Sequence, residues 1–167
     1  QQRHVRMPRR RLTRVKWQDA AHAYDRASGS PARAGRRKLA MTHFDIFNGD
    51  ADGICALVQL RLAAPIDATL VTGAKRDIAL LDRVAGGPGD SATVLDLSLA
   101  VNRVALQRLL DRGVAIEYFD HHYAGEIPVH PGLDAHVDPD PSLCTGILVD
   151  RHLDRRRGEI AAVDLLG

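Results

Sequence analysis

Cysteine is scarce in this chain, which has only Cys55 and Cys144 among 167 residues. Two cysteines this far apart in sequence indicate neither a disulfide framework nor a thiolate zinc cluster. So few cysteines are typical of proteins from a reducing compartment, and we therefore expect a cytoplasmic protein.

Aromatic side chains and long apolar runs are also lacking. Phe, Trp and Tyr make up 4% of a chain that is 45% hydrophobic, so aliphatic side chains have to form most of a single-domain core. No aromatic stacking surface for bases is evident, so a nucleic-acid substrate is not required. No apolar run approaches the length of a membrane span, and none near the start resembles a signal peptide, so no membrane partner is expected.

Acidic residues are rare in the first part of the chain. Residues 1–40 contain 12 Lys or Arg and 2 Asp or Glu, a net charge of +10. The remaining residues contain 11 Lys or Arg and 19 Asp or Glu, a net charge of −8, so the total of +2 is the sum of two unlike segments. The first segment is rich in Arg, Ser, Gly and Pro, a composition that favours disorder. We expect residues 1–41 to be a basic extension and residues 42–167 the folded domain. The extension could be a segment without a role, a nucleic-acid-binding arm or a transit peptide.

Strand-like and helix-like segments alternate from Thr42 onward. Apolar and β-branched runs indicate four strands, at 43–47, 68–72, 92–98 and 114–119. Helical spacing follows each strand, at 53–64, 77–85, 101–113 and 142–153. Ser142 is the expected N-cap of the last helix, and Gly113 the C-cap of the one before it. The alternation predicts an α/β fold, a parallel sheet with helices on both faces in three layers.

Polar side chains lie at the ends of three expected strands. Asn48-Gly49-Asp50-Ala51-Asp52 follows the first strand, Asp96 lies at the end of the third, and Asp120-His121-His122 follows the fourth. Ligands of such sheets bind beyond the carboxyl ends of the strands, so we expect these side chains to converge there. Carboxylates this close together repel one another unless cations lie between them. Carboxylate and imidazole ligands suit Mn²⁺ or Mg²⁺, and an aspartate that bridges two ions would give a two-metal hydrolytic site.

The same residues also fit roles other than metal binding. Asp52 could be only a helix cap, and the paired histidines could be solvated loop residues. Residues 48–53 fit the first half of an EF-hand loop, but its twelfth position is Gln59 where glutamate is required, and no phosphate-loop pattern is present. A catalytic thiol at Cys55 or Cys144 is possible, although we expect both cysteines to be buried on apolar helix faces.

These motifs, in this order and spacing, resemble the DHH phosphoesterase family over about residues 42–167. The resemblance rests on the Asp-x-Asp turn of Asp50 and Asp52, on Asp96, and on the tripeptide 120–122. Proteins of this family are Mn²⁺-dependent hydrolases of phosphodiesters or phosphoric anhydrides. They include single-strand exonucleases, nano-RNases, cyclic dinucleotide phosphodiesterases and pyrophosphatases.

The resemblance implies a role for each motif residue. Asp50 and Asp52 would each bind one ion, Asp96 would bridge both ions, and His121 would be a further ligand. His122 would contact the scissile phosphate, and Asp120 would orient an imidazole.

Two features depart from the family pattern. Asn48 stands where many members have an Asp or His ligand, so it would be at most a weak ligand. A fourth metal-binding aspartate is expected near the end of the domain. Asp164 is a candidate for it, but the expected position lies just past Gly167, and the smaller substrate domain does not follow, which suggests a truncated chain.

The sequence therefore predicts a metal-dependent hydrolase that uses two Mn²⁺ ions, with Mg²⁺ as a possible replacement. Its substrate would be a phosphate-containing small molecule or a short single-stranded nucleic acid, and no protein partner can be inferred. Lys75 and Arg76, just after the second strand, could contact substrate phosphates or could be solvated surface residues. The alternative is a non-catalytic metal- or nucleotide-binding module, or an inactive fragment that lacks the final ligand.

Overall fold

A computed structural model describes residues 41–166 of the chain and the side chains of residues 41–158. Residues 1–40, to which nearly all of the expected basic extension belongs, lie outside the described residues. None of the helices between residues 41 and 166 is long and apolar enough to cross a membrane.

The described residues form a parallel sheet of five strands in the order β2-β1-β3-β4-β5. The strands are β1 (His43–Asn48), β2 (Thr69–Gly73), β3 (Ser91–Leu95), β4 (Ala115–Asp120) and β5 (Leu133–Val137). Val, Ile, Phe and Thr are frequent in the inner strands, as expected for strands that are covered on both faces. The predicted α/β class with a parallel sheet is confirmed.

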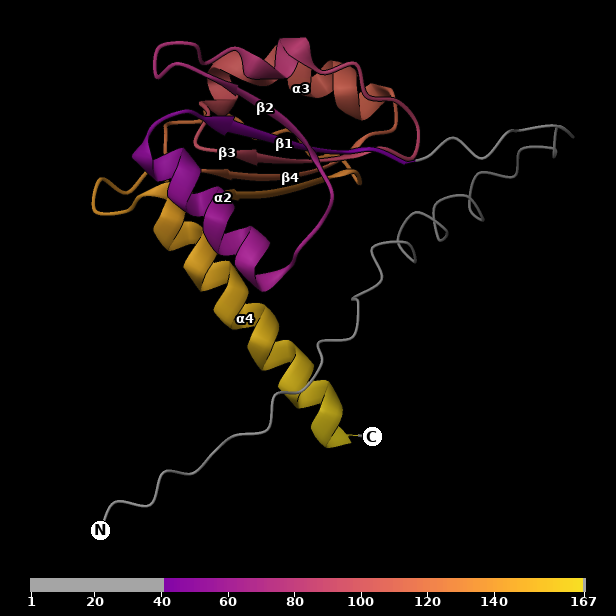
Figure 1. The fold of residues 1–167 in the computed structure, drawn as a ribbon, viewed down its shortest axis with the longest axis vertical. Helices are drawn as coiled ribbons and strands as arrows, with labels where there is room; N and C mark the ends of the chain where they lie inside the picture. Colours follow the sequence, from indigo (N-terminus) through magenta and orange to yellow (C-terminus); the bar gives the residue numbers. More distant parts are fainter. Residues whose placement is uncertain (1–40, 167) are drawn as a thin grey trace, which may run out of the picture. The chain divides into compact units, whose positions relative to one another are not determined.

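Helices cover both faces of this sheet. Helix α3 (Leu99–Asp111) lies on one face, and helices α2 (Ala51–Ala63) and α4 (Thr145–Leu166) lie side by side on the other (Figure 1). Successive strand residues point to opposite faces, so Ile46 packs in the core beneath α3, whereas Phe47 packs in the core beneath α2 and α4. The sandwich therefore has the three predicted layers.

The strand register brings three strand ends to one edge of the sheet. Phe47 of β1 is level with Leu95 of β3, and Leu95 is level with Phe119 of β4. Strand β2 lies on one side of β1, and β3 lies on the other side. The connections after β1 and β3 therefore run in opposite directions, and the space between the carboxyl ends of these two strands is a topological switch point. The loops that follow β1, β3 and β4 therefore meet where α/β proteins bind their ligands.

Gly113 ends helix α3 as predicted. It has a φ of +82°, and its N–H donates a hydrogen bond to Leu110 O, while the N–H of Val114 donates to Leu109 O. These two bonds form a Schellman motif, which requires a residue in the left-handed region at this position.

The helix predicted for residues 77–85 is wrong, because only a 3₁₀ turn, η1 (Leu80–Arg83), forms there. The side chain of Asn102 explains the difference. Its amide donates to Ile78 O at 2.7 Å and its oxygen accepts from Leu81 N, so it occupies backbone groups that an α-helix would use. Gly86, Gly87 and Pro88 then prevent any extension of the turn.

The prediction of Ser142 as an N-cap is also wrong. Its N–H and its hydroxyl both bind Asp140 Oδ1, at 2.9 and 2.7 Å, in a turn that precedes the helix. Helix α4 begins at Thr145 instead. Strand β5 was not predicted, because Asp134 and His136 interrupt the apolar pattern of Leu133–Val137.

Candidate metal centre

Asp50 caps helix α2 in a turn that requires glycine. Its Oδ1 accepts hydrogen bonds from the N–H groups of Asp52 and Gly53, at 3.1 and 3.3 Å. A Cβ at Gly53 would collide with the backbone oxygen of Asn48, and one at Gly49 would collide with that of Gly73. The tight glycine-flanked turn therefore places two aspartates directly beyond β1, and the cap considered for Asp52 belongs to Asp50.

Asp52 receives the first N–H groups of helix α4. Thr145 N donates to Asp52 Oδ2 at 2.8 Å, and Gly146 N donates to Oδ1 at 2.9 Å. A helix N-terminus carries a partial positive charge and unpaired N–H donors, so it stabilises an anion at this position. Helix α4 thus holds the Asp52 carboxylate in one orientation.

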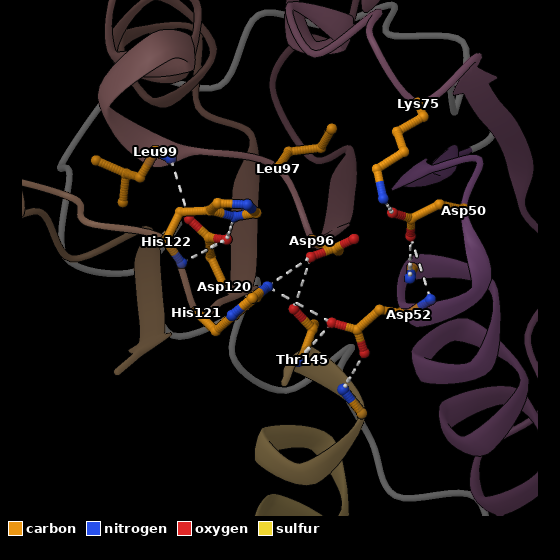
Figure 2. Close-up of polar contacts among 12 residues, drawn as sticks. Asp50, Asp52, Lys75, Asp96, Leu97, Leu99, Asp120, His121, His122 and Thr145 are labelled. Atoms are coloured by element: carbon orange, nitrogen blue, oxygen red, sulfur yellow. Dashed lines mark hydrogen bonds and ion pairs between the residues drawn. The ribbon is translucent and has the colours of Figure 1, made fainter. Parts of the chain in front are cut away.

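Asp96 is buried in an unusual backbone conformation. Its φ is +58°, the only positive value of a non-glycine residue between residues 41 and 166, and only 2% of its surface is exposed. This conformation is uncommon outside glycine, and such strain often accompanies functional sites. Strand β3 ends at Leu95, directly before Asp96. The hydroxyl of Thr145 donates a hydrogen bond to Asp96 Oδ1 at 3.1 Å. Figure 2 shows the Asp96 carboxylate between those of Asp50 and Asp52 on one side and the histidines on the other.

The charges around Asp96 favour a positive ion. Burial, the carboxylate of Asp52 and the carboxylate of Asp50 raise the pKa of Asp96 from 3.8 to about 7. An acid whose pKa is raised by neighbouring acids is one whose ionised form lacks a counter-charge. A cation bound among these carboxylates would supply that charge.

His121 and His122 come from the end of β4. His121 Nε2 lies 3.4 Å from Asp96 Oδ1 and 3.7 Å from Asp52 Oδ2 (Figure 2). One ligand atom each of Asp96, His121 and His122 lies within 4.8 Å of the other two, a spacing that could hold a metal ion.

Asp120 fixes the orientation of His122. Its Oδ1 lies 2.6 Å from His122 Nδ1 and also accepts the His122 N–H, and its Oδ2 accepts the N–H of Leu99 at 3.2 Å. This arrangement leaves Nε2 of His122 for another partner. Asp120 is fully buried, and burial raises its pKa even though these hydrogen bonds oppose the rise.

The remaining predicted residues differ in their relation to this cluster. Lys75 Nζ lies 3.2 Å from Asp50 Oδ2, whereas Arg76 is exposed and contacts no acidic group of the described chain. Burial would raise the pKa of Asp50, but the Gly53 N–H and Lys75 outweigh that effect and lower it. Asn48 is 6% exposed, and its Oδ1 has no hydrogen-bond partner among the described residues.

Sequence reasoning missed Thr145, which contacts two of the carboxylates. The only signal was a small polar residue before Gly146 at the start of a helical pattern, and the prediction of Ser142 as the cap obscured it. The expectation of a buried Cys55 is wrong, because the residue lies on an exposed part of α2, and Cys144 is partly exposed. Both thiols are free. The side chain of Asp164 lies outside the described residues.

The donor set fits a hard or borderline divalent cation. It combines carboxylate oxygens with imidazole nitrogens, and it includes a buried carboxyl with a raised pKa and a buried amide oxygen without a partner. No family model, curated protein or solved structure matches the chain.

Proposed function

We propose that the chain is a metal-dependent phosphoesterase that resembles the DHH family, a hydrolase of phosphodiester or phosphoanhydride bonds. One observation carries the proposal. The side chains that follow three strand ends lie close together at one edge of the sheet: Asp50 and Asp52 interact with Asp96, and His121 and His122 lie beside Asp96.

Four residues would hold the ions, as the resemblance implies. Asp50 and Asp52 would each bind one ion, Asp96 would bridge them, and His121 would complete the set, with Asn48 as a weak ligand. We propose Mn²⁺ with Mg²⁺ as a replacement, because oxygen-rich sites with one or two imidazoles suit these ions. When bound, two such ions supply an acidified water and neutralise charge on the phosphoryl oxygens.

The side chains around the ligands would position the substrate. Asp120 holds His122 so that its Nε2 would contact a phosphoryl oxygen, where negative charge develops during hydrolysis. Lys75 lies next to Asp50 and could attract a second phosphate. Arg76 is exposed and forms no ion pair with the carboxylates of this cluster, so a phosphate contact is proposed for Lys75 alone.

The substrate would be a phosphate-containing small molecule or a short single-stranded nucleic acid. Aromatic residues are few in this chain, which favours recognition of phosphate over stacking of bases. Two free cysteines fit a reducing compartment, so we place the protein in the cytoplasm.

One observation favours a non-catalytic metal-binding module as the second candidate. Both oxygens of Asp52 already accept N–H groups of α4, and one oxygen of Asp50 lies next to Lys75, so the two-ion ligand set is partly engaged. Such a module would bind Mn²⁺ but would not hydrolyse phosphate esters.

A hydrolysis screen separates the two candidates. The full chain is assayed with Mn²⁺ against short oligonucleotides, cyclic dinucleotides and pyrophosphate, beside the H122Q and D96N variants. We expect one substrate class to be hydrolysed, H122Q to retain Mn²⁺ and lose turnover, and D96N to lose both. Mn²⁺ binding without hydrolysis of any substrate would support the binding module.

A further inference from the structure

A second group of metal-ligating side chains lies away from the cluster at the strand ends. Glu117 comes from β4, His136 from the neighbouring edge strand β5, and His152 from helix α4. One ligand atom of each lies within 4.8 Å of the other two. The group occupies the face of the sheet that α4 covers, because Phe119, which contacts both histidine rings, belongs to the core beneath α2 and α4.

Each of these three residues has a buried polar atom without a hydrogen-bond partner among the described residues. The atoms are Glu117 Oε1, His136 Nε2 and His152 Nε2. His152 is only 8% exposed. Buried polar atoms are nearly always hydrogen-bonded, so three unpartnered atoms that face one another need an explanation.

The distances between the atoms fit metal coordination better than direct hydrogen bonds. Glu117 Oε1 lies 3.3 Å from His152 Nε2 and 3.7 Å from His136 Nε2. Ligands of a tetrahedral zinc ion, bound at about 2.0–2.2 Å, lie roughly 3.3–3.5 Å from one another. A small contraction of the group would bring all three atoms into contact with one ion.

We propose that Glu117, His136 and His152 form a second metal site that binds one Zn²⁺ ion. Two imidazoles and one carboxylate are a ligand set that zinc accepts, and imidazole nitrogen favours zinc over Mn²⁺ and Mg²⁺. The oxygen-rich cluster at the strand ends has the opposite preference. The fourth position is open to water or to Asp134, whose Oδ2 lies 3.3 Å from His136 Nε2.

The protonation states of the group are those of ligands. Burial would raise the pKa of Glu117, but His136, His152 and Arg156 outweigh it and lower the pKa, so the carboxylate is ionised. Burial lowers the pKa of His152, with His136 and Arg156 adding to the effect and Glu117 opposing it, so this imidazole is neutral near pH 7. The charge of Arg156 opposes a cation here, and the carboxylates of Glu117 and Asp134 offset it.

This ion would fasten helix α4 to the edge of the sheet. Zinc would join the helix to β4 and to β5, which is the last strand and has a neighbour on only one side. The first residue of the same helix, Thr145, contacts Asp52 and Asp96. The site would therefore be structural, and it does not depend on the proposed hydrolysis.

Cobalt titration followed by zinc competition tests the proposal. The 167-residue chain carries D50N and H121Q, which weaken the cluster at the strand ends, and Co²⁺ serves as the spectroscopic probe of the remaining site. We expect one Co²⁺ per chain, with visible absorption of a low-coordinate nitrogen- and oxygen-ligated ion, displaced by one equivalent of Zn²⁺.

Variants of the second site show which residues bind the ion. E117Q keeps the shape of the side chain, and D154N on the exposed surface of α4 is the matched control. Ligand support alone commonly changes metal affinity 10–100-fold, so we expect E117Q and H152Q to weaken binding at least about 100-fold and D154N to leave it unchanged. Zn²⁺ should also raise the melting temperature of the wild-type chain and of D154N, and raise that of E117Q much less.

Other results would overturn the proposal. Absence of a tightly bound Co²⁺ in the D50N/H121Q chain, or equal affinity in E117Q and D154N, would show that the group is only an ion-paired histidine cluster. If H152Q fails to fold, the test still rests on two measurements. These are Co²⁺ binding by the D50N/H121Q chain and the comparison of E117Q with D154N.

Discussion

Thr145 and Asp96 join the start of helix α4 to the end of strand β3. The Thr145 hydroxyl donates a hydrogen bond to Asp96 Oδ1 at 3.1 Å, and the two residues are 49 positions apart in the chain. The N–H of the same threonine donates to Asp52. One residue therefore supports two carboxylates of the candidate centre, and α4 is part of that centre as well as of the core.

Replacing Thr145 by valine tests this relationship. Valine keeps the shape but removes the donor, and a buried acceptor that loses its partner costs about 1–3 kcal/mol. We expect the free energy of unfolding of T145V to fall by about that amount in urea titrations, and its Mn²⁺ affinity to fall as well. S142A is the control, because the Ser142 hydroxyl binds only Asp140 in an exposed turn. Equal unfolding midpoints for T145V and S142A would mean that the buried bond contributes nothing.

The raised pKa of Asp96 predicts how stability depends on pH in the absence of metal. The folded protein holds this proton up to its raised pKa of about 7, whereas the unfolded chain releases it near the ordinary carboxyl pKa of 3.8. Between these pH values the folded state binds more protons, so stability is highest at the acid end and falls as pH rises. A pKa difference of about three units lowers the free energy of unfolding by at most about 4 kcal/mol over this pH range.

The D96N variant isolates this effect. Asparagine tolerates the left-handed conformation of residue 96 and carries no charge. We expect D96N to be more stable than the wild type at pH 8 in EDTA, to lose that advantage at pH 4, and to bind Mn²⁺ poorly. Urea unfolding at both pH values, with the exposed D67N as control, measures the difference. A wild-type advantage over D96N that grows with pH would contradict the raised pKa.

Gly53 and Gly158 should respond to alanine in opposite ways. A Cβ at Gly53 would collide with the backbone of Asn48, whereas one at Gly158 in α4 would meet nothing within 4 Å. We expect G53A to lower the free energy of unfolding by about 1–3 kcal/mol or more and to weaken Mn²⁺ binding, because it displaces the Asp50 turn. G158A should raise the free energy of unfolding by up to about 1 kcal/mol. Thermal and urea unfolding of both variants measure these changes in the free energy of unfolding. A G53A variant that is as stable as the wild type and still binds Mn²⁺ would show that the turn can move.

A buried ion pair in the first half of β1 gives a further stability prediction. Asp45 is 1% exposed and is bound by Arg61 of α2 and by His43. Burial would raise the pKa of Asp45, but Arg61 and His43 outweigh it and lower the pKa. Removing one partner of a buried pair leaves an uncompensated charge and costs about 3–5 kcal/mol, so we expect R61M to lose that much stability in urea titrations at pH 7.

The double variant and the pH dependence check the cause. R61M/D45N removes both charges and should recover much of the lost stability. Because the pKa of Asp45 is lowered on folding, its contribution is present above about pH 3.8 and is lost as pH falls through the folded pKa. A double variant as unstable as R61M would show that the packing of Arg61, and not its charge, is what matters.

The sequence predicted the parts of this structure that depend on local pattern. Alternating apolar segments gave the parallel sheet and its two covered faces, and the strand ends gave the positions of Asp50, Asp96 and His121. Contacts between distant segments were not visible. Asn102 suppresses a helix in residues 77–85, and Asp140 shifts the start of α4 from Ser142 to Thr145.

The group of Glu117, His136 and His152 was not predicted, for the same reason. Glu117, His136 and His152 lie on two strands and a helix, and one of those strands has no clear apolar pattern. Only the register that places Glu117 opposite Asp134, and Phe119 opposite His136, brings the side chains together. A group assembled by register and helix packing has no motif that a reader of the sequence could recognise.

Lys75 should compete with a metal ion for Asp50. Its ammonium lies 3.2 Å from Asp50 Oδ2 and is largely exposed, so it occupies part of the space around an expected ligand. Two unit charges at about this distance interact by roughly 1 kcal/mol in water, which corresponds to about fivefold in affinity. We therefore expect K75M to bind Mn²⁺ about fivefold more tightly in isothermal titration, and to hydrolyse its substrate with a higher KM if Lys75 contacts a phosphate. R112M, which removes a positive charge from the end of α3, is the control and should change neither value. Weaker Mn²⁺ binding by K75M would mean that Lys75 holds Asp50 in place for the ion, so that the ammonium supports the site and does not compete with the metal.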